Sequence, residues 1–119
     1  MRELIPPIDP RLYQNKKVFD HEIVYELTTQ KDGLPFGIAI ADIEQSVRHR
    51  HERTLETYTG VQGELEVTVG SDIHILHPGD ILQIPIGVVH SARSLGEDPA
   101  RITVTSVPEW SQEDHILVE

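Results

Sequence analysis

The sequence predicts an all-β protein built as an antiparallel sandwich or barrel. Segments with alternating polar and apolar residues recur about every ten residues along the chain, as short strands do in such folds. Clusters of glycine, proline and aspartate separate these segments and favour turns. No stretch shows a convincing helical period of apolar residues.

The N-terminal part is predicted to be an arm followed by a first strand. Residues 1–17 contain Pro6, Pro7 and Pro10, which favour extended backbone. We expect this arm to lie over the body of the protein or over a partner subunit. Residues 18–28 alternate in polarity and predict a strand with one largely buried face.

A second strand is predicted at residues 34–44, the most apolar run of the chain. The preceding residues 30–33 end in Asp-Gly, which favours a turn because glycine readily adopts a positive φ. The run has one bulky and one small face, as a strand would: Phe36, Ile38 and Ile40 form the former, and Gly37, Ala39 and Ala41 the latter.

The second half of the chain predicts several more strands. The clearest alternation lies at residues 64–69, and further strands are predicted at 72–76, 81–84, 88–93 and 101–107. We expect Gly60 and Gly63 to mark a bend or tight turn before them. After Pro108, residues 109–119 predict a tail that docks as an edge strand or a short piece of helix.

Length and composition narrow the class of protein. The chain has 119 residues, enough for one domain over residues 1–119 with its own core. It has no cysteine, which excludes disulfides and thiolate metal sites. The formal net charge of −10 opposes binding to nucleic acids and anionic membranes. No apolar run reaches the roughly 18 residues of a membrane span, and the N-terminus lacks a signal-peptide pattern, so a cytoplasmic location is expected.

The most informative stretch contains His49 and His51, two positions apart. On a strand, such side chains point to the same face, with Cα atoms roughly 6.6–7 Å apart. Two imidazole nitrogens placed in this way can converge on one metal ion at about 2.0–2.2 Å. Glu56 follows beyond a short turn and is the preferred carboxylate, because Glu52 has the opposite strand parity.

His90 is the candidate for a fourth ligand. It follows Pro85, which fixes φ, and Gly87, which allows a sharp reversal of the chain. A turn with both residues would set the register of the strand that follows it. The segment between Glu56 and His90 is long enough for two hairpin strands. The four side chains could therefore meet inside one barrel.

Three arginines surround the histidine pair: Arg48, Arg50 and Arg53. Strand parity places Arg48 and Arg50 on the face opposite the histidines, so they are interpreted as a basic outer face. The alternative is that Arg53 or Arg93 reaches an anionic substrate.

Two motifs in this region resemble the signature motifs of the cupin superfamily. The stretch His49-x-His51-x4-Glu56-x6-Gly63 is similar to the first motif, and Gly79-x5-Pro85-x-Gly87-x2-His90 to the second. Their order and ligand types are similar to those of a small single-domain metal-binding cupin of the cupin 2 type. Two positions differ, since Ile43 stands where the first motif usually opens with glycine and Ser94 where the second usually closes with asparagine.

The resemblance implies a double-stranded β-helix, or jelly roll, with a divalent transition metal ion at the open end of the barrel. The implied ligands are His49, His51, Glu56 and His90. Three neutral imidazoles and one carboxylate would leave a net charge of about +1 and, in an octahedral site, two open positions. Iron, manganese, nickel, cobalt, copper and zinc all suit such ligands.

The other histidines are not expected to bind a metal ion. His74 and His77 are three residues apart on a strand and its turn, so they point to opposite faces and make a poor second metal site. His21 and His115 lie in terminal segments and are expected at the surface. Trp110 is expected to be a packing plug or an interface anchor.

Two functional classes follow. The first is an enzyme with a mononuclear metal site, acting on a small polar molecule as a dioxygenase, isomerase, decarboxylase or lyase. Proton abstraction would need a general base, for which Tyr58 is a weak candidate; its other interpretation is core filler. The second class is a non-catalytic small-molecule binding or storage module. We also expect a homodimer, because cupins commonly pair and the arm with residues 18–28 could extend a neighbour's sheet.

Overall fold

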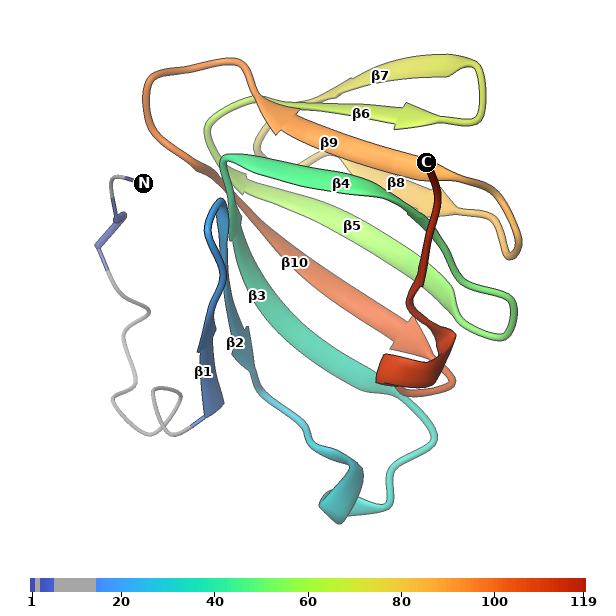
Figure 1. Cartoon of the computed structure of the whole chain (residues 1–119). Coiled ribbons are helices and arrows are strands. Elements are labelled where there is room, and N and C mark those ends of the chain that lie inside the picture. Colours follow the sequence, from blue (N-terminus) through green and yellow to red (C-terminus); the bar gives the residue numbers. More distant parts are fainter. Residues whose placement is uncertain (2, 6–14) are drawn as a thin grey trace.

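A computed structural model of the chain describes residues 1, 3–5 and 15–119, and it shows two antiparallel sheets arranged as a jelly roll (Figure 1). One sheet contains, in spatial order, β1 (Lys16–Val18), β2 (Glu22–Glu26), β3 (Gly37–Ile43), β10 (Ala100–Val107), β5 (Leu55–Gln62) and β8 (Ile81–Ile84). The other contains β11 (Ile116–Leu117), β4 (Gln45–Arg50), β9 (His90–Ser94), β6 (Leu65–Val69) and β7 (Asp72–Leu76). The predicted all-β jelly roll is confirmed.

The predicted strand at residues 18–28 is interrupted. β1 ends at Val18, and β2 begins only at Glu22. The backbone turns between them, and the N–H of Phe19 donates a hydrogen bond to the carbonyl of Glu22 at 2.8 Å. The predicted proline-rich part of the arm, with Pro6, Pro7 and Pro10, lies outside the described residues.

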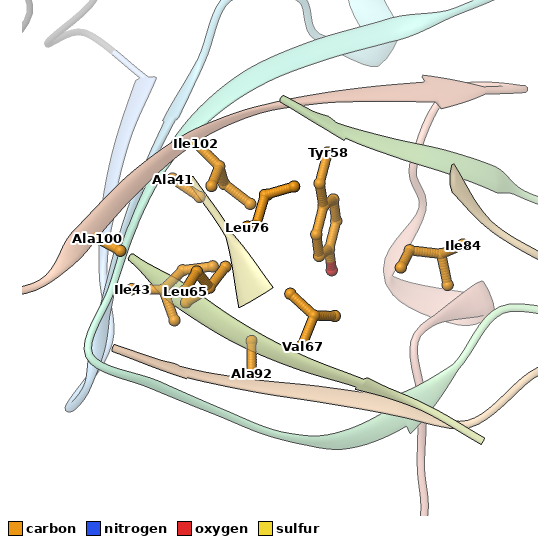
Figure 2. Close-up of a cluster of buried hydrophobic side chains, with 10 residues drawn as sticks. All are labelled: Ala41, Ile43, Tyr58, Leu65, Val67, Leu76, Ile84, Ala92, Ala100 and Ile102. Atoms are coloured by element: carbon orange, nitrogen blue, oxygen red, sulfur yellow. The ribbon is translucent and has the colours of Figure 1, made fainter. Parts of the chain in front are cut away.

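The small face of β3 points into the barrel. Ala41 and Ile43 lie opposite Ile102 and Ala100 of β10, and all four are buried in the core shown in Figure 2. The facing sheet fills the space above them with larger side chains, among them Val67 of β6. Alternation identified the two faces of this strand from the sequence, and the depth of the opposing sheet decides which of them faces inward.

The C-terminal tail is both a helical turn and an edge strand, as the two sequence alternatives proposed. The 3₁₀ helix η3 (Gln112–Asp114) precedes β11, which pairs with β4. Another 3₁₀ helix, η2 (Gln30–Asp32), lies in the predicted turn before β3. In the described part of the chain, no helix has the length and apolar character needed to cross a membrane.

Gly60 does not mark a turn, contrary to the expectation from the sequence. It lies inside β5, where the turn between β7 and β8 crosses it closely. Its N–H donates to the carbonyl of Asp80 at 2.9 Å, and its own carbonyl accepts from the N–H of Gly79 at 2.9 Å. A Cβ atom at this position would stand 2.2 Å from the carbonyl oxygen of His77, so glycine is required for this close approach.

We predict that Gly60→Ala lowers the free energy of unfolding by about 3 kcal/mol, because the added methyl group overlaps backbone that cannot move independently. Thermal and urea denaturation measure the change. Gly96→Ala is the matched control, since the nearest atom to its Cβ position is the Asp98 nitrogen at 4.0 Å. Equal stability of the two variants would contradict this account of Gly60.

Candidate metal centre

The structure brings all four predicted ligand residues together inside the barrel. His49 lies on β4, His51 follows its end, Glu56 lies near the start of β5, and His90 opens β9. All four are buried, and one potential ligand atom from each lies within 4.8 Å of the others. This group is able to bind a metal ion.

Strand pairing places two of the histidines side by side. β4 and β9 are antiparallel neighbours, and His49 lies directly opposite His90, with ring centroids 4.1 Å apart. The turn before β9 is joined to the loop that carries His51, because the N–H of Gly87 donates to the His51 carbonyl at 2.6 Å. Gly87 has a φ of 81°, which confirms that the Pro-x-Gly turn needs glycine here.

His51 reaches the same point as His49, although not by the strand geometry assumed from the sequence. β4 ends at Arg50, so His51 lies in the loop before β5. Its ring is edge-on to that of His49, with a centroid distance of 5.1 Å. Contacts with the C-terminal tail, described below, set its orientation.

The backbone holds each of the three imidazoles by its Nδ1 atom. The partner carbonyls are Val47 at 2.7 Å for His49, Val88 at 3.1 Å for His90 and Asp114 at 2.9 Å for His51. Because carbonyls only accept hydrogen bonds, each Nδ1 carries the proton, and each Nε2 presents its lone pair. Metal-binding histidines are commonly oriented in this way.

The remaining atoms of the cluster fit a metal ion better than they fit one another. Oε1 of Glu56 lies 2.9 Å from Nε2 of His51 and 3.4 Å from Nε2 of His90. All three atoms are buried, yet none has a hydrogen bond of acceptable geometry. Buried polar atoms without partners are unfavourable, so this arrangement is explained best by a cation that all of them can contact.

The electrostatics of His49 and Glu56 favour the protonation states in which these two residues bind a cation. Burial, and then the neighbouring His90, lower the pKa of His49 to about 4. Burial raises the pKa of Glu56, but its contacts with His51 and His90 outweigh this effect and bring the pKa to about 2. At neutral pH the site therefore offers a neutral imidazole at His49 and an ionised carboxylate, both of which are metal-ligating forms.

Asp114 is a residue of this site that the sequence analysis missed. Its carboxylate accepts hydrogen bonds from the backbone N–H groups of Glu52, Arg53 and Thr54 at 2.9–3.2 Å. Its backbone carbonyl accepts the Nδ1–H of His51. One residue of the tail therefore fixes both the loop between β4 and β5 and the ligand that the loop carries.

His115 is not a surface residue, and that expectation was wrong. Its ring is half-buried, with its centroid 4.5 Å from that of His49 and 5.8 Å from that of His51. Burial, and then the imidazole of His51, lower the pKa of His115. β11 places His115 here by pairing with β4. The sequence analysis expected an edge strand as one form of the tail but did not predict its partner strand.

Trp110 has the packing role that was expected of it. It is half-buried, and its ring centroid lies 5.8 Å from that of His115, on the same tail. The ammonium group of Lys17 lies 5.7 Å from the centre of the indole ring.

Two further ionisable groups lie inside the barrel. Tyr58 is buried in the core, and burial, followed by the charge of Glu56, raises its pKa well above the usual value. A phenol held protonated in this way suits packing rather than proton abstraction. Glu22 was missed by the sequence analysis: burial, and then the charge of Glu56, raise its pKa to about 7.

The arginines lie outside the cluster. Arg93 points to the face opposite His90 and pairs with Glu66 at 2.9 Å, which argues against a contact with substrate. Arg48 donates to the carbonyl of Glu119 at 3.1 Å and is exposed. Arg53 has 63% of its side chain exposed, beside Asp114 at the rim. The basic-outer-face interpretation is the one that fits these positions.

The remaining histidines and the two departures from the motifs are structural. His21 is exposed, as expected, and His74 and His77 are exposed as well. Ile43 is a core residue, and Ser94 stabilises the loop after β9 by donating to the carbonyl of Asp98 at 2.6 Å.

Fold and site together define a jelly-roll barrel whose interior carries a group of histidines and a carboxylate. The chain belongs to the cupin domain family, whose model matches residues 40–106. This range includes all four residues of the cluster and ends before the tail that carries Asp114 and His115.

The chain is also similar to a curated relative and to two solved structures. The urease accessory protein UreE of Synechococcus sp. (strain JA-3-3Ab) is 28% identical over 97 residues, covering 80% of this chain and 63% of the relative. The chain therefore spans less than two thirds of that relative's length. Ectoine synthase from P. lautus superposes with a TM-score of 0.77 at 15% identity, over 98% of this chain and 91% of that chain. KdgF from Halomonas sp. gives 0.69 at 22% identity, over 82% and 88%. At these identities the two structures show the fold alone.

We predict that Asp114→Asn weakens both the loop and the metal site. An amide offers one acceptor oxygen in place of two and turns its NH₂ group toward backbone donors. The free energy of unfolding should fall by about 1–3 kcal/mol, and metal affinity should fall by about 10–100-fold, because His51 loses its fixed orientation. Calorimetry of unfolding and metal titration measure the two effects. Glu113→Gln, an exposed neighbour on η3, is the control and should change neither; unchanged metal affinity in the Asp114 variant would disprove the positioning role.

Proposed function

We propose that this protein is a metal-dependent enzyme that acts on a small polar molecule through a mononuclear site made by His49, His51, Glu56 and His90. The observation that carries the proposal is the convergence of buried ligand atoms that have no hydrogen-bond partners. The three imidazoles of the group are already held in place by hydrogen bonds at Nδ1. Such a site is preorganised for a cation before the cation arrives. Iron, manganese, nickel, cobalt, copper and zinc remain candidates.

The four side chains contribute different charges to the site. Glu56 supplies the negative charge, and the three imidazoles supply neutral nitrogens, so the loaded site would carry a charge of about +1. A bound metal ion supplies Lewis acidity toward a carbonyl or carboxylate oxygen, or redox chemistry, depending on its identity. On its inner side the cluster borders the hydrophobic core, because the ring centroid of the buried Tyr58 lies 6.3 Å from that of His90.

Recognition of a second molecule, which an enzyme needs, is favoured over storage of a metal ion alone, because two polar side chains of the C-terminal segment have buried atoms without hydrogen-bond partners in the described residues. Glu109 and His115 each have a buried polar atom that makes no hydrogen bond. A site that only retained a metal ion would not need them. A site that orients a second molecule at the open positions of the metal would.

The alternative is a non-catalytic binding or storage module. The curated relative is named as an accessory protein, which is the specific observation in favour of this alternative. Incubation of metal-loaded protein with a panel of small acids and sugars, followed by product analysis, separates the two. Turnover of any member supports the enzyme, and tight binding without turnover supports the module.

We predict that His49→Ala, His51→Ala and His90→Ala each reduce the bound metal from about one ion per chain to a small fraction, because a remaining three-ligand set holds a cation far less tightly. Elemental analysis of protein purified without chelators measures this, and circular dichroism checks that the sheets persist. His74→Ala, an exposed histidine on β7, is the control. Wild-type protein that retains none of the offered metals would overturn the proposal.

We also propose that the chain forms a homodimer through β1. This strand lies at the edge of its sheet, all three of its residues are exposed, and Val18 and Phe19 remain 65% and 55% exposed. A second copy that added to this edge would pair with the backbone of β1 and cover both side chains.

Light scattering coupled to size exclusion at micromolar concentration should therefore give the mass of two chains. Phe19→Glu should shift the mass toward one chain, since it buries a charge in the new interface. Ile73→Glu, an equally exposed apolar residue on β7, should leave the dimer intact. A wild-type protein with the mass of a single chain would contradict the pairing.

A further inference from the structure

Buried polar atoms without partners occur at two places in the described part of the chain. Three of these atoms belong to the cluster: His51 Nε2, His90 Nε2 and Glu56 Oε1. The other two, Glu109 Oε2 and His115 Nδ1, both lie on the C-terminal segment (residues 109–119). Leaving a buried polar group unpaired is unfavourable, and more so if the group is charged. Two such atoms on one short segment indicate a common ligand.

His115 lies beside the cluster, and Glu109 packs on the inner face of β3 in the same barrel. The ring centroid of His115 lies 4.5 Å from that of His49. Cγ of Glu109 lies 3.1 Å from the position that a Cβ on Gly37 would take, so Glu109 packs directly on β3.

The sheet register connects this position to the cluster. Gly37 is opposite Ser106, and Ser106 is opposite Glu56, so the three lie in one row across β3, β10 and β5. Directly opposed residues point to the same face of a sheet. Glu109 therefore covers the inner face two strands away from the carboxylate of the cluster.

The C-terminal segment is firmly attached, so these positions are not the result of a loose tail. Asp114 accepts three backbone N–H groups, and β11 pairs with β4. In Figure 1 the segment, in dark red, runs from the end of β10 past β4. The segment lies beside the cluster, and Trp110 packs near His115.

We propose that Glu109 and His115 form a polar subsite beside the metal cluster that recognises a small hydroxylated carboxylic acid. The inference rests on the proposed metal function, because a carboxylate oxygen of the ligand would bind at the metal-loaded cluster, whose charge would be about +1. The neighbouring hydroxyl group matches the other two atoms. It would donate its proton to Oε2 of the Glu109 carboxylate, which can only accept, and it would accept from Nδ1 of His115 in the tautomer that carries the proton there. An acid without the hydroxyl group would leave both side chains unpaired.

The test compares acetate with glycolate, which differ by that one hydroxyl group, on cobalt(II)-loaded protein. The visible absorption of the cobalt ion reports metal binding before any acid is added, and its change on titration reports the affinity for each acid. Wild-type protein should prefer glycolate by about tenfold or more. Chelation of the metal by glycolate alone also produces a preference, so the variants decide the origin of the effect.

Glu109→Gln, His115→Ala and His115→Phe should lower the glycolate preference by about tenfold while the cobalt spectrum stays that of the wild type. The phenylalanine variant keeps a ring against His49, which guards against a loss of packing in the alanine variant. Glu113→Gln and His74→Ala are exposed controls and should keep the full preference.

The outcomes separate the two proposals. A preference that survives in the Glu109 and His115 variants disproves the subsite and leaves the metal function standing. A wild-type protein that develops the cobalt spectrum but does not distinguish the two acids does the same. If no cobalt spectrum develops, both proposals fail.

Discussion

The metal cluster depends on the contact between Asp114 and the loop that joins β4 to β5. Three ligand positions are supported locally by strands, since His49 and His90 are paired neighbours and Glu56 lies on β5. His51 has no strand beneath it and takes its orientation from the Asp114 carbonyl. The Asp114 carboxylate holds the loop through three backbone donors, and charge-assisted hydrogen bonds of this kind are among the stronger ones in proteins. The orientation of His51 is therefore set by a residue near the far end of the chain.

The barrel places apolar and polar interiors next to each other, and each limits the other. Core residues such as Val67 and Ile102 supply most of the burial that stabilises the sheets. The cluster lies directly beyond Tyr58, and its unpartnered buried atoms oppose folding until a cation binds. Glu22 adds a second carboxyl group to the same interior. Unlike Glu56 it resists ionisation, because its pKa is raised to about 7. Stability and metal occupancy should consequently be linked.

Much of the fold and the ligand set followed from local sequence, and the errors followed from long-range contacts. Alternation located most of the strands, and the resemblance to the two cupin motifs implied that His49, His51, Glu56 and His90 converge. Gly60 was misassigned because its requirement comes from the backbone at His77, which approaches from a different hairpin. His115 was placed at the surface because nothing near it in the sequence indicates that β11 pairs with β4. Neither contact leaves a periodic signal that could be read from a single sequence.

The contrast between local sequence and long-range contacts also indicates where specificity for a ligand arises. The cluster is fixed by strand register and by two motifs, so any chain with the same motifs on the same barrel would present nearly the same ligands to a metal ion. Such a centre distinguishes poorly between acids that bind through one oxygen. Discrimination must come from polar groups outside the motifs that point into the same space. In the described residues, Glu109 and His115 have this property, and both belong to the segment that Asp114 holds in place. The contact that orients His51 also positions the two atoms best placed to select the ligand, so coordination and selection share one structural support.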